Sequence, residues 1–135
     1  MNTKPVLTAA DVKVILTAAE QHASEHQWAV AISVVDDGGH LLGLVRRDGA
    51  APISAAISAA KARTAALGRR ESKGYEDAIN QGRYSVLSAP EIQGMMEGGV
   101  PIVADKHVVG AVGVSGVKPG QDAETARAGI AALKL

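Results

Sequence analysis

The sequence predicts an α+β fold, in which helices pack against an antiparallel sheet. Two segments have the pattern of β-hairpins, VVDDGGHLLGLV and PIVADKHVVGAV, because each places two apolar runs on either side of a polar turn. The predicted order is helix, hairpin, helices, hairpin, helix. Strands that follow one another directly in hairpins favour an antiparallel sheet over parallel βαβ units.

The first helix is expected from about Ala9 to His26. Thr8 and Asp11 have the spacing of a capping box, with Asp in place of the usual Glu. At 3.6 residues per turn, one apolar stripe follows the helix. It consists of Val12, Ile15, Leu16, Ala19 and Ala23.

The first hairpin is expected to pair a strand from Trp28 to Val35 with a return strand from His40 to Arg47. Asp37-Gly38-Gly39 between them is a strong turn signal. A loop from Asp48 to Pro52 then leads into a long Ala-rich helix from Ile53 to Leu67.

The second half continues with a short helix from Ser72 to Asn80, while Gly82 to Ser88 has no clear assignment. The second hairpin pairs Val100–Ala104 with Val108–Ser115, and a last helix is expected from Asp122 to Leu133.

The composition predicts one domain, residues 1–135, that associates with itself. The chain has no Phe, and its aromatic residues are Trp28, Tyr75 and Tyr84, whereas Ala, Val and Gly are abundant. Small residues bury less apolar area each, so burial between subunits would add stability. A dimer or larger homo-oligomer is therefore expected.

Charge and cysteine content exclude several classes. The 14 basic and 14 acidic residues give no net charge, whereas a nucleic-acid-binding protein needs a basic surface. The absence of Cys excludes thiolate ligands and a Cys nucleophile. No apolar run approaches the roughly 18 residues of a membrane span, and no signal peptide is evident, so a cytoplasmic protein without a membrane partner is expected.

Four segments together resemble the GlcG/HbpS family in order and spacing: SVVDDGGHLLGLVRRDGA, SAAISAAKARTAAL, GGVPIVADKHVVGAVGVSG and QDAETARAGI. That family includes haem-binding HbpS-type proteins and the C-terminal domain of PduO-type adenosyltransferases. The resemblance covers about Thr8 to Leu133. It implies a profilin-like α/β sandwich, oligomeric assembly and, for some relatives, haem binding or a role in haem and iron handling.

His22 and His26 are the candidate haem or metal ligands. They lie four residues apart at the border of the apolar stripe, where an imidazole is shielded and still reaches outward. The resemblance supports haem, because haem-binding relatives use a histidine of the first helix. We expect His22 to be the haem or metal ligand, since it lies further towards the edge of the stripe. The alternative is a pair of packing histidines without a ligand.

Lys61, Arg46 and Asp48 form a second set, from which Lys61 and Asp48 are the candidate catalytic residues. In the profilin-like arrangement the end of the first hairpin and the Ala-rich helix can lie side by side. A desolvated Lys there can act as a base or bind a carboxylate. The alternative is an ordinary Lys that pairs with Asp48.

Gly113 and Ser115 are candidate cofactor-binding residues, because a strand without side chains that ends ahead of a helix N-terminus admits a small ligand. The spacing GAVGVSG is not a dinucleotide fingerprint, since its glycines lie within an antiparallel strand. Asp122 is interpreted as a residue of the helix start that interacts with the helix dipole.

Three functions follow. The leading one is a small-molecule-binding protein with haem as the ligand. The second is an enzyme of small-molecule catabolism that uses Lys61 or Asp48, and the third is an assembly module without a ligand.

Overall fold

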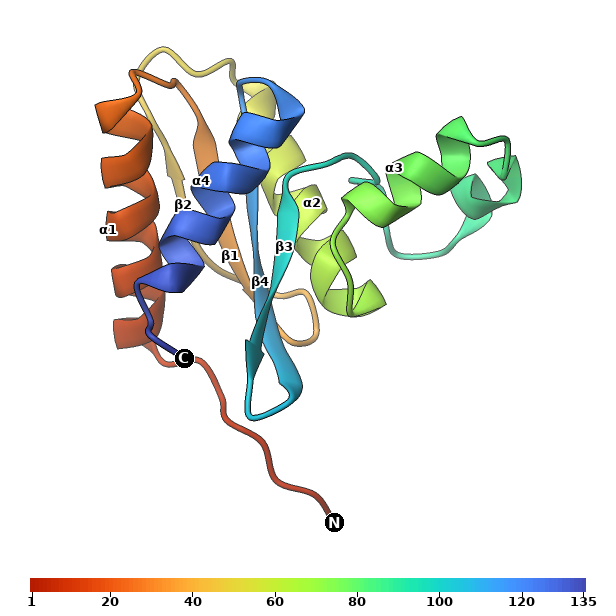
Figure 1. Cartoon of the computed structure of the whole chain (residues 1–135), viewed down its shortest axis with the longest axis horizontal. Coiled ribbons are helices and arrows are strands. Elements are labelled where there is room, and N and C mark those ends of the chain that lie inside the picture. The colour runs from red at the N-terminus through yellow and green to blue at the C-terminus, as the bar shows by residue number, and fades with distance from the viewer.

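The computed structural model describes all 135 residues and contains one antiparallel sheet with helices on both faces (Figure 1). The strand order is β2-β1-β4-β3, so the two hairpins are joined by pairing of β1 with β4. This confirms the α+β class and both predicted hairpins. The strands are β1 (Ala31–Asp36), β2 (Leu41–Arg46), β3 (Gly99–Ala104) and β4 (His107–Ser115).

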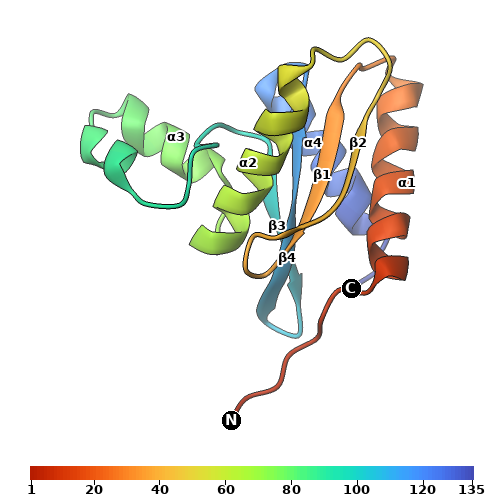
Figure 2. The same ribbon diagram turned by 180° about the vertical axis from the view of Figure 1, so that it is seen from behind.

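Three long helices cover the sheet. α1 (Ala9–Glu25) and α4 (Pro119–Ala131) pack side by side on one face, and α2 (Ile53–Gly68) packs on the other, as the opposite views in Figures 1 and 2 show. The main core lies under α1 and α4. None of the helices is both long and apolar enough to cross a bilayer.

The two faces of the sheet differ in the size of their side chains. On β1, Ile32 and Val34 belong to the main core, whereas Ser33 hydrogen-bonds across the other face to Ser58 of α2, 2.8 Å between their hydroxyl oxygens. Alanines of α2 complete that second face. The Ala-rich helix therefore packs with its backbone close to the strands.

Gly113 shows how close this packing is. A Cβ atom added there would lie 2.5 Å from the amide nitrogen of Ala62 and closer still to the carbonyl oxygen of Ser58. The backbone of α2 thus occupies the space over the glycine. The close approach that a glycine in a strand allows is made here by helix α2 itself.

Local signals account for most element boundaries. Thr8 accepts a hydrogen bond from the amide of Asp11, and the Asp11 carboxylate accepts one from the amide of Thr8, which confirms the capping box. These bonds, first the one from the Thr8 backbone, lower the pKa of Asp11. In the second hairpin, Asp105 and Lys106 both have positive φ, as a type I′ turn requires.

The bounds of two expected elements are corrected, and the segment without an assignment is now assigned. The last helix begins at Pro119 instead of Asp122 and ends at Ala131, because Pro suits the first helical position, where no amide donor is needed. The first strand begins at Ala31 instead of Trp28. The unassigned segment contains a 3₁₀-helix, η1 (Tyr84–Ser88).

α3 (Lys73–Asn80) and η1 form an arm that extends sideways from the layered body (Figures 1 and 2). Neither element has a buried residue. Tyr84 and Leu87 of η1 are among the exposed large apolar side chains of the molecule. A helix of this length gains little stability by itself in water, so packing must support the arm.

Candidate functional site

Two histidines, a tryptophan and a glutamate meet at the C-terminal end of α1. His22 lies in the last turn of the helix and His26 is its C-cap, so the spacing of four residues stacks them on one face. Trp28 follows in the connection to β1, and Glu124 comes from the neighbouring helix α4. We call these four side chains the imidazole cluster.

Hydrogen bonds orient both imidazole rings. Nε2 of His22 lies 2.7 Å from Oε2 of Glu124. Nδ1 of His26 lies 2.8 Å from the carbonyl oxygen of His22, which can only accept, so this nitrogen donates. In neutral His26 the lone pair is therefore on Nε2, which makes no hydrogen bond to the protein.

Aromatic contacts support the same rings. The ring of His26 stacks on Trp28 with centroids 4.4 Å apart and an interplanar angle of 26°. The rings of His22 and His26 also have centroids 4.4 Å apart. The exposed fraction is 23% for the His22 side chain and 53% for that of Glu124. The cluster is thus ordered by contacts within the chain and open to solvent on one side.

Lys61 lies in a different place, in the interior between α2 and α4. Its ammonium nitrogen is 3.1 Å from Oδ2 of Asp122 and 3.0 Å from the carbonyl oxygen of Val114. The two side chains are only 5% and 4% exposed. Burial raises the pKa of Asp122, although Lys61 and a hydrogen bond from the Val117 amide act in the opposite direction.

This pair corrects the expected pairing of Lys61 with Asp48. Asp48 lies on an exposed loop, where it lines a shallow hollow together with Glu20, Arg46 and Arg47. Lys61 does not line that hollow. The structure therefore does not bring the two candidate catalytic residues together. Asp122 does lie in the first turn of α4, as expected, and also neutralises the buried ammonium.

Gly113 and Ser115 lie on β4 beside this buried pair. Both are buried, and α2 covers Gly113 directly. Their side of the strand is occupied by the protein's own helix, so packing explains the small residues at these two positions.

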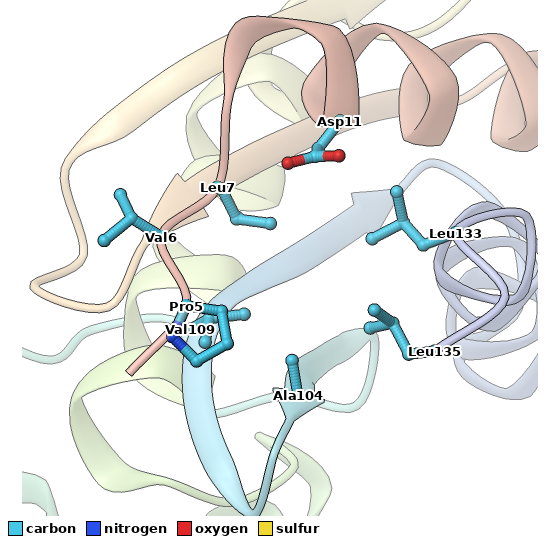
Figure 3. Close-up of a pocket in the computed structure, with 8 residues that line it drawn as sticks. All are labelled: Pro5, Val6, Leu7, Asp11, Ala104, Val109, Leu133 and Leu135. Carbon is cyan, nitrogen blue, oxygen red and sulfur yellow. The ribbon is translucent and has the colours of Figure 1, made fainter. Parts of the chain in front are cut away.

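No hollow on the surface is lined by an imidazole. One of about 490 Å³ follows the outer face of α1 from Ala10 to Gln21. Another of about 250 Å³ lies beside α2, where Ile53, Ile57 and Met96 give it apolar walls. A third, of only about 90 Å³, lies between the two chain termini and the second hairpin (Figure 3). None of them encloses the imidazole cluster.

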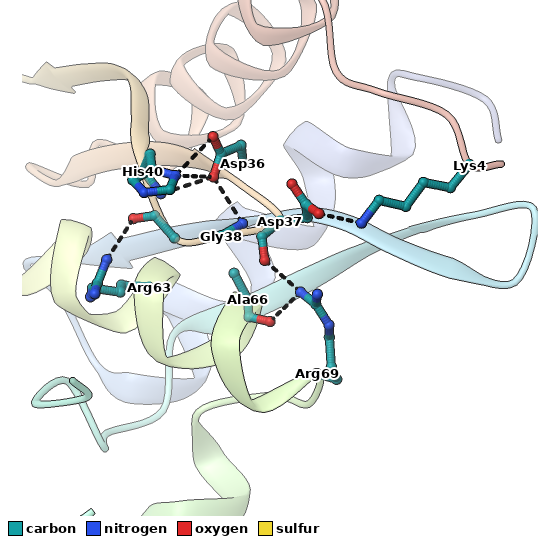
Figure 4. Close-up of polar contacts among 9 residues, drawn as sticks. Lys4, Asp36, Asp37, Gly38, His40, Arg63, Ala66 and Arg69 are labelled. Atoms are coloured by element: carbon teal, nitrogen blue, oxygen red, sulfur yellow. Dashed lines mark hydrogen bonds and ion pairs between the residues drawn. The ribbon is translucent and has the colours of Figure 1, made fainter. Parts of the chain in front are cut away.

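The turn of the first hairpin is a structural polar network (Figure 4). Asp36 accepts hydrogen bonds from the amides of Gly38 and His40, each at 2.9 Å, and also contacts the His40 ring. Burial of Asp36 tends to raise its pKa, but these hydrogen bonds prevail and lower it. Arg69 of the α2 C-cap donates to the carbonyl of Asp37. The turn predicted at Asp37-Gly38-Gly39 is confirmed.

Sequence reasoning placed the two histidines side by side on one helix face but missed Glu124 as the partner of His22. Glu124 is 102 positions from His22, and no local pattern links them. The pairing depends on how α1 and α4 pack, which only the folded chain shows.

Both the sequence and the structure of this chain are similar to those of known proteins. The family model described as "Haem degrading protein HbpS-like" matches residues 7–131. Protein GlcG of Escherichia coli K12 is 52% identical over 115 residues, 85% of each chain. Klebsiella pneumoniae protein ORFY superposes with a TM-score of 0.90 at 32% identity, over 99% of this chain and 97% of that one. A structure described as a PduOC:heme complex superposes with a TM-score of 0.86 at 28% identity, over 95% of both chains. This chain therefore belongs to the HbpS-like family, as its ordered sequence segments indicate.

Proposed function

We propose that this chain binds haem through an imidazole at the end of α1 and acts in haem or iron handling. The family description and the relative solved with haem support the choice of ligand. Within this chain the supporting observation is the His26 ring, whose Nε2 carries a free lone pair and whose orientation is set by a main-chain hydrogen bond. Neutral imidazole nitrogen is a common axial ligand of haem iron.

The hydrogen bonds favour His26 over His22 as that ligand. His22 Nε2 is engaged with Glu124 and would have to leave a carboxylate partner first. His26 needs no such exchange, because its hydrogen bond uses Nδ1 and leaves Nε2 available to hold the iron if haem binds. Trp28 adds a flat apolar surface beside the His26 ring. We thus propose His26 in place of His22, the ligand expected from the helix stripe.

A second copy of the chain would supply the remaining walls of the haem site. The cluster is open to solvent, and a haem-binding site normally has extensive apolar walls. The molecule also has apolar surface to cover at the arm, at Tyr84 and Leu87, and in the hollow beside α2. We therefore propose a homo-oligomer. Sedimentation equilibrium at micromolar concentration tests it, and a stable monomer there would exclude it.

Haem titration followed by absorption tests the ligand. We expect one haem per site, a Soret band typical of histidine ligation, and a clear loss of affinity or band shift in His26→Ala. His107→Ala, at the second hairpin, is the matched control and should behave as the unchanged protein. If His26→Ala and the double variant His22→Ala/His26→Ala both keep the original band and affinity, histidine ligation from α1 is wrong.

A further inference from the structure

We propose that His22, His26 and Glu124 also form a binding site for a divalent transition-metal ion, which the protein fills when haem is absent. One ligand atom from each residue lies within 4.8 Å of those of the other two. Two elements far apart in sequence supply these ligands. The C-terminal end of α1, with its C-cap, supplies both imidazoles, and α4 supplies the carboxylate. We call this set the metal triad.

The ligand atoms must move to hold a small ion, because they lie within 4.8 Å of one another and are not evenly spaced. Zn²⁺ holds imidazole nitrogen and carboxylate oxygen at about 2.0–2.2 Å in tetrahedral geometry, which separates its ligand atoms by about 3.3 Å. The His22 and Glu124 atoms are 2.7 Å apart, so they must part by roughly half an ångström to admit an ion between them. Both side chains are partly exposed, at 23% and 53%, and have room for that movement.

The surroundings of His26 match those of a metal-binding histidine. Such a histidine typically donates its other ring nitrogen to a carbonyl or carboxylate, which sets the tautomer and the ring orientation. In this chain, Nδ1 of His26 donates to the His22 carbonyl oxygen, and Trp28 stacks on the ring. The ligand nitrogen is thus oriented before any ion binds.

The donor set determines the class of ion. Two imidazoles and one carboxylate suit borderline ions such as Zn²⁺, Co²⁺ and Ni²⁺, while Mg²⁺ and Ca²⁺ prefer oxygen ligands alone. Three protein ligands leave a fourth position for water on the open side of the triad. A bound ion would link the end of α1 to α4. It would also compete with haem, since both would use Nε2 of His26.

The chain contains its own control. His40 also pairs with a carboxylate, 3.1 Å from Asp36, but no second imidazole joins them. The four histidines of the chain are the two of the triad together with His40 and His107. Replacement of His22 and His26, compared with replacement of His40 and His107, therefore distinguishes metal binding at the triad from metal binding by surface histidines.

Calorimetry with Zn²⁺ and absorption with Co²⁺, on tag-free and haem-free protein, test the proposal. We expect one Zn²⁺ per chain and Co²⁺ bands of tetrahedral type, both retained in His40→Ala/His107→Ala. Glu124→Gln and His26→Ala should each weaken Zn²⁺ binding by at least about tenfold, because loss of even an outer partner of a metal ligand costs about 10–100-fold. Melting curves in EDTA establish that the variants fold.

The opposite pattern would overturn the metal site: full Zn²⁺ affinity in Glu124→Gln and in His22→Ala/His26→Ala, or loss of binding in His40→Ala/His107→Ala. The haem proposal is judged separately. Glu124→Gln should keep its haem affinity, because the ring of His26 does not contact that carboxylate through a hydrogen bond. If the protein binds Zn²⁺ but not haem, the metal-site proposal holds and only the haem proposal is wrong.

Discussion

Replacement of Gly113 by Ala should separate α2 from the sheet and destabilise the protein strongly. The new Cβ would lie 2.5 Å from the Ala62 amide nitrogen, where about 3.0 Å is the lower limit for real contacts, and it would overlap the Ser58 carbonyl oxygen more severely. Both obstructing atoms belong to the backbone of α2. A rotamer change therefore cannot relieve the clash, and the helix must move by more than about half an ångström.

The cost has two parts. Overpacking of a closed core costs about 1–3 kcal/mol, and the upper end applies because the neighbours are rigid. Movement of α2 also stretches the buried hydrogen bond between Ser33 and Ser58, which contributes about 1 kcal/mol. We expect a loss of about 3–4 kcal/mol in the free energy of unfolding, by urea denaturation.

Gly120→Ala is the matched control, since no atom lies within 4 Å of the added Cβ and the residue is in the first turn of α4. This variant should be as stable as the unchanged protein, or slightly more so, because Ala favours helix. Equal stability of Gly113→Ala and Gly120→Ala would refute the close packing of α2 on β4.

Three further changes test buried and hydrogen-bonded groups. Lys61→Met should lower the free energy of unfolding by about 3–5 kcal/mol at neutral pH, because it leaves the Asp122 carboxylate buried without a cation. This loss should shrink as the pH falls through the raised pKa of Asp122, and the double variant Lys61→Met/Asp122→Asn should recover most of it. Thr64→Val should stabilise by up to about 1 kcal/mol, because the buried Thr64 hydroxyl has no hydrogen-bond partner in the protein, and calorimetric melting measures this. Because the pKa of Asp36 is lowered in the folded chain, Asp36 stabilises the fold above about pH 4, and this contribution is lost as the pH falls through its pKa in the folded state. In an acid titration, Asp36→Asn should therefore lose less stability than the unchanged chain.

The elements that sequence reasoning located correctly have local causes. The capping box at Thr8 and the turn Asp37-Gly38-Gly39 involve residues within a few positions, so their patterns are visible in the sequence. The boundary errors arose where two local signals compete. Asp122 is a good residue for a helix start, but Pro119 is equally suited to the first position and lies earlier in the chain.

Long-range pairs were beyond the reach of such patterns. The partner of Lys61 is 61 positions away, and the choice between Asp48 and Asp122 depends on which loop lies over the C-terminal end of β4. Asp48 lies in the loop between a strand and a helix, and Asp122 lies in the first turn of a helix that follows a strand, so the sequence alone does not tell which of them meets Lys61. Burial decides the matter, because only Asp122 is enclosed with the ammonium.

The same small residues that predicted self-association explain how the imidazole cluster forms. A Cβ added at Gly129 of α4 would lie 2.9 Å from the carbonyl oxygen of Ile15 and 3.1 Å from the Cβ of Ala19, so α1 and α4 pack with almost no side chain between them. At that spacing the side chains at the rim of the contact meet directly, and Glu124 reaches His22. A bulky residue at position 129 would push the helices apart and separate the carboxylate from the imidazoles. The small residues of the helices thus bring Glu124 to His22 as well as filling the core.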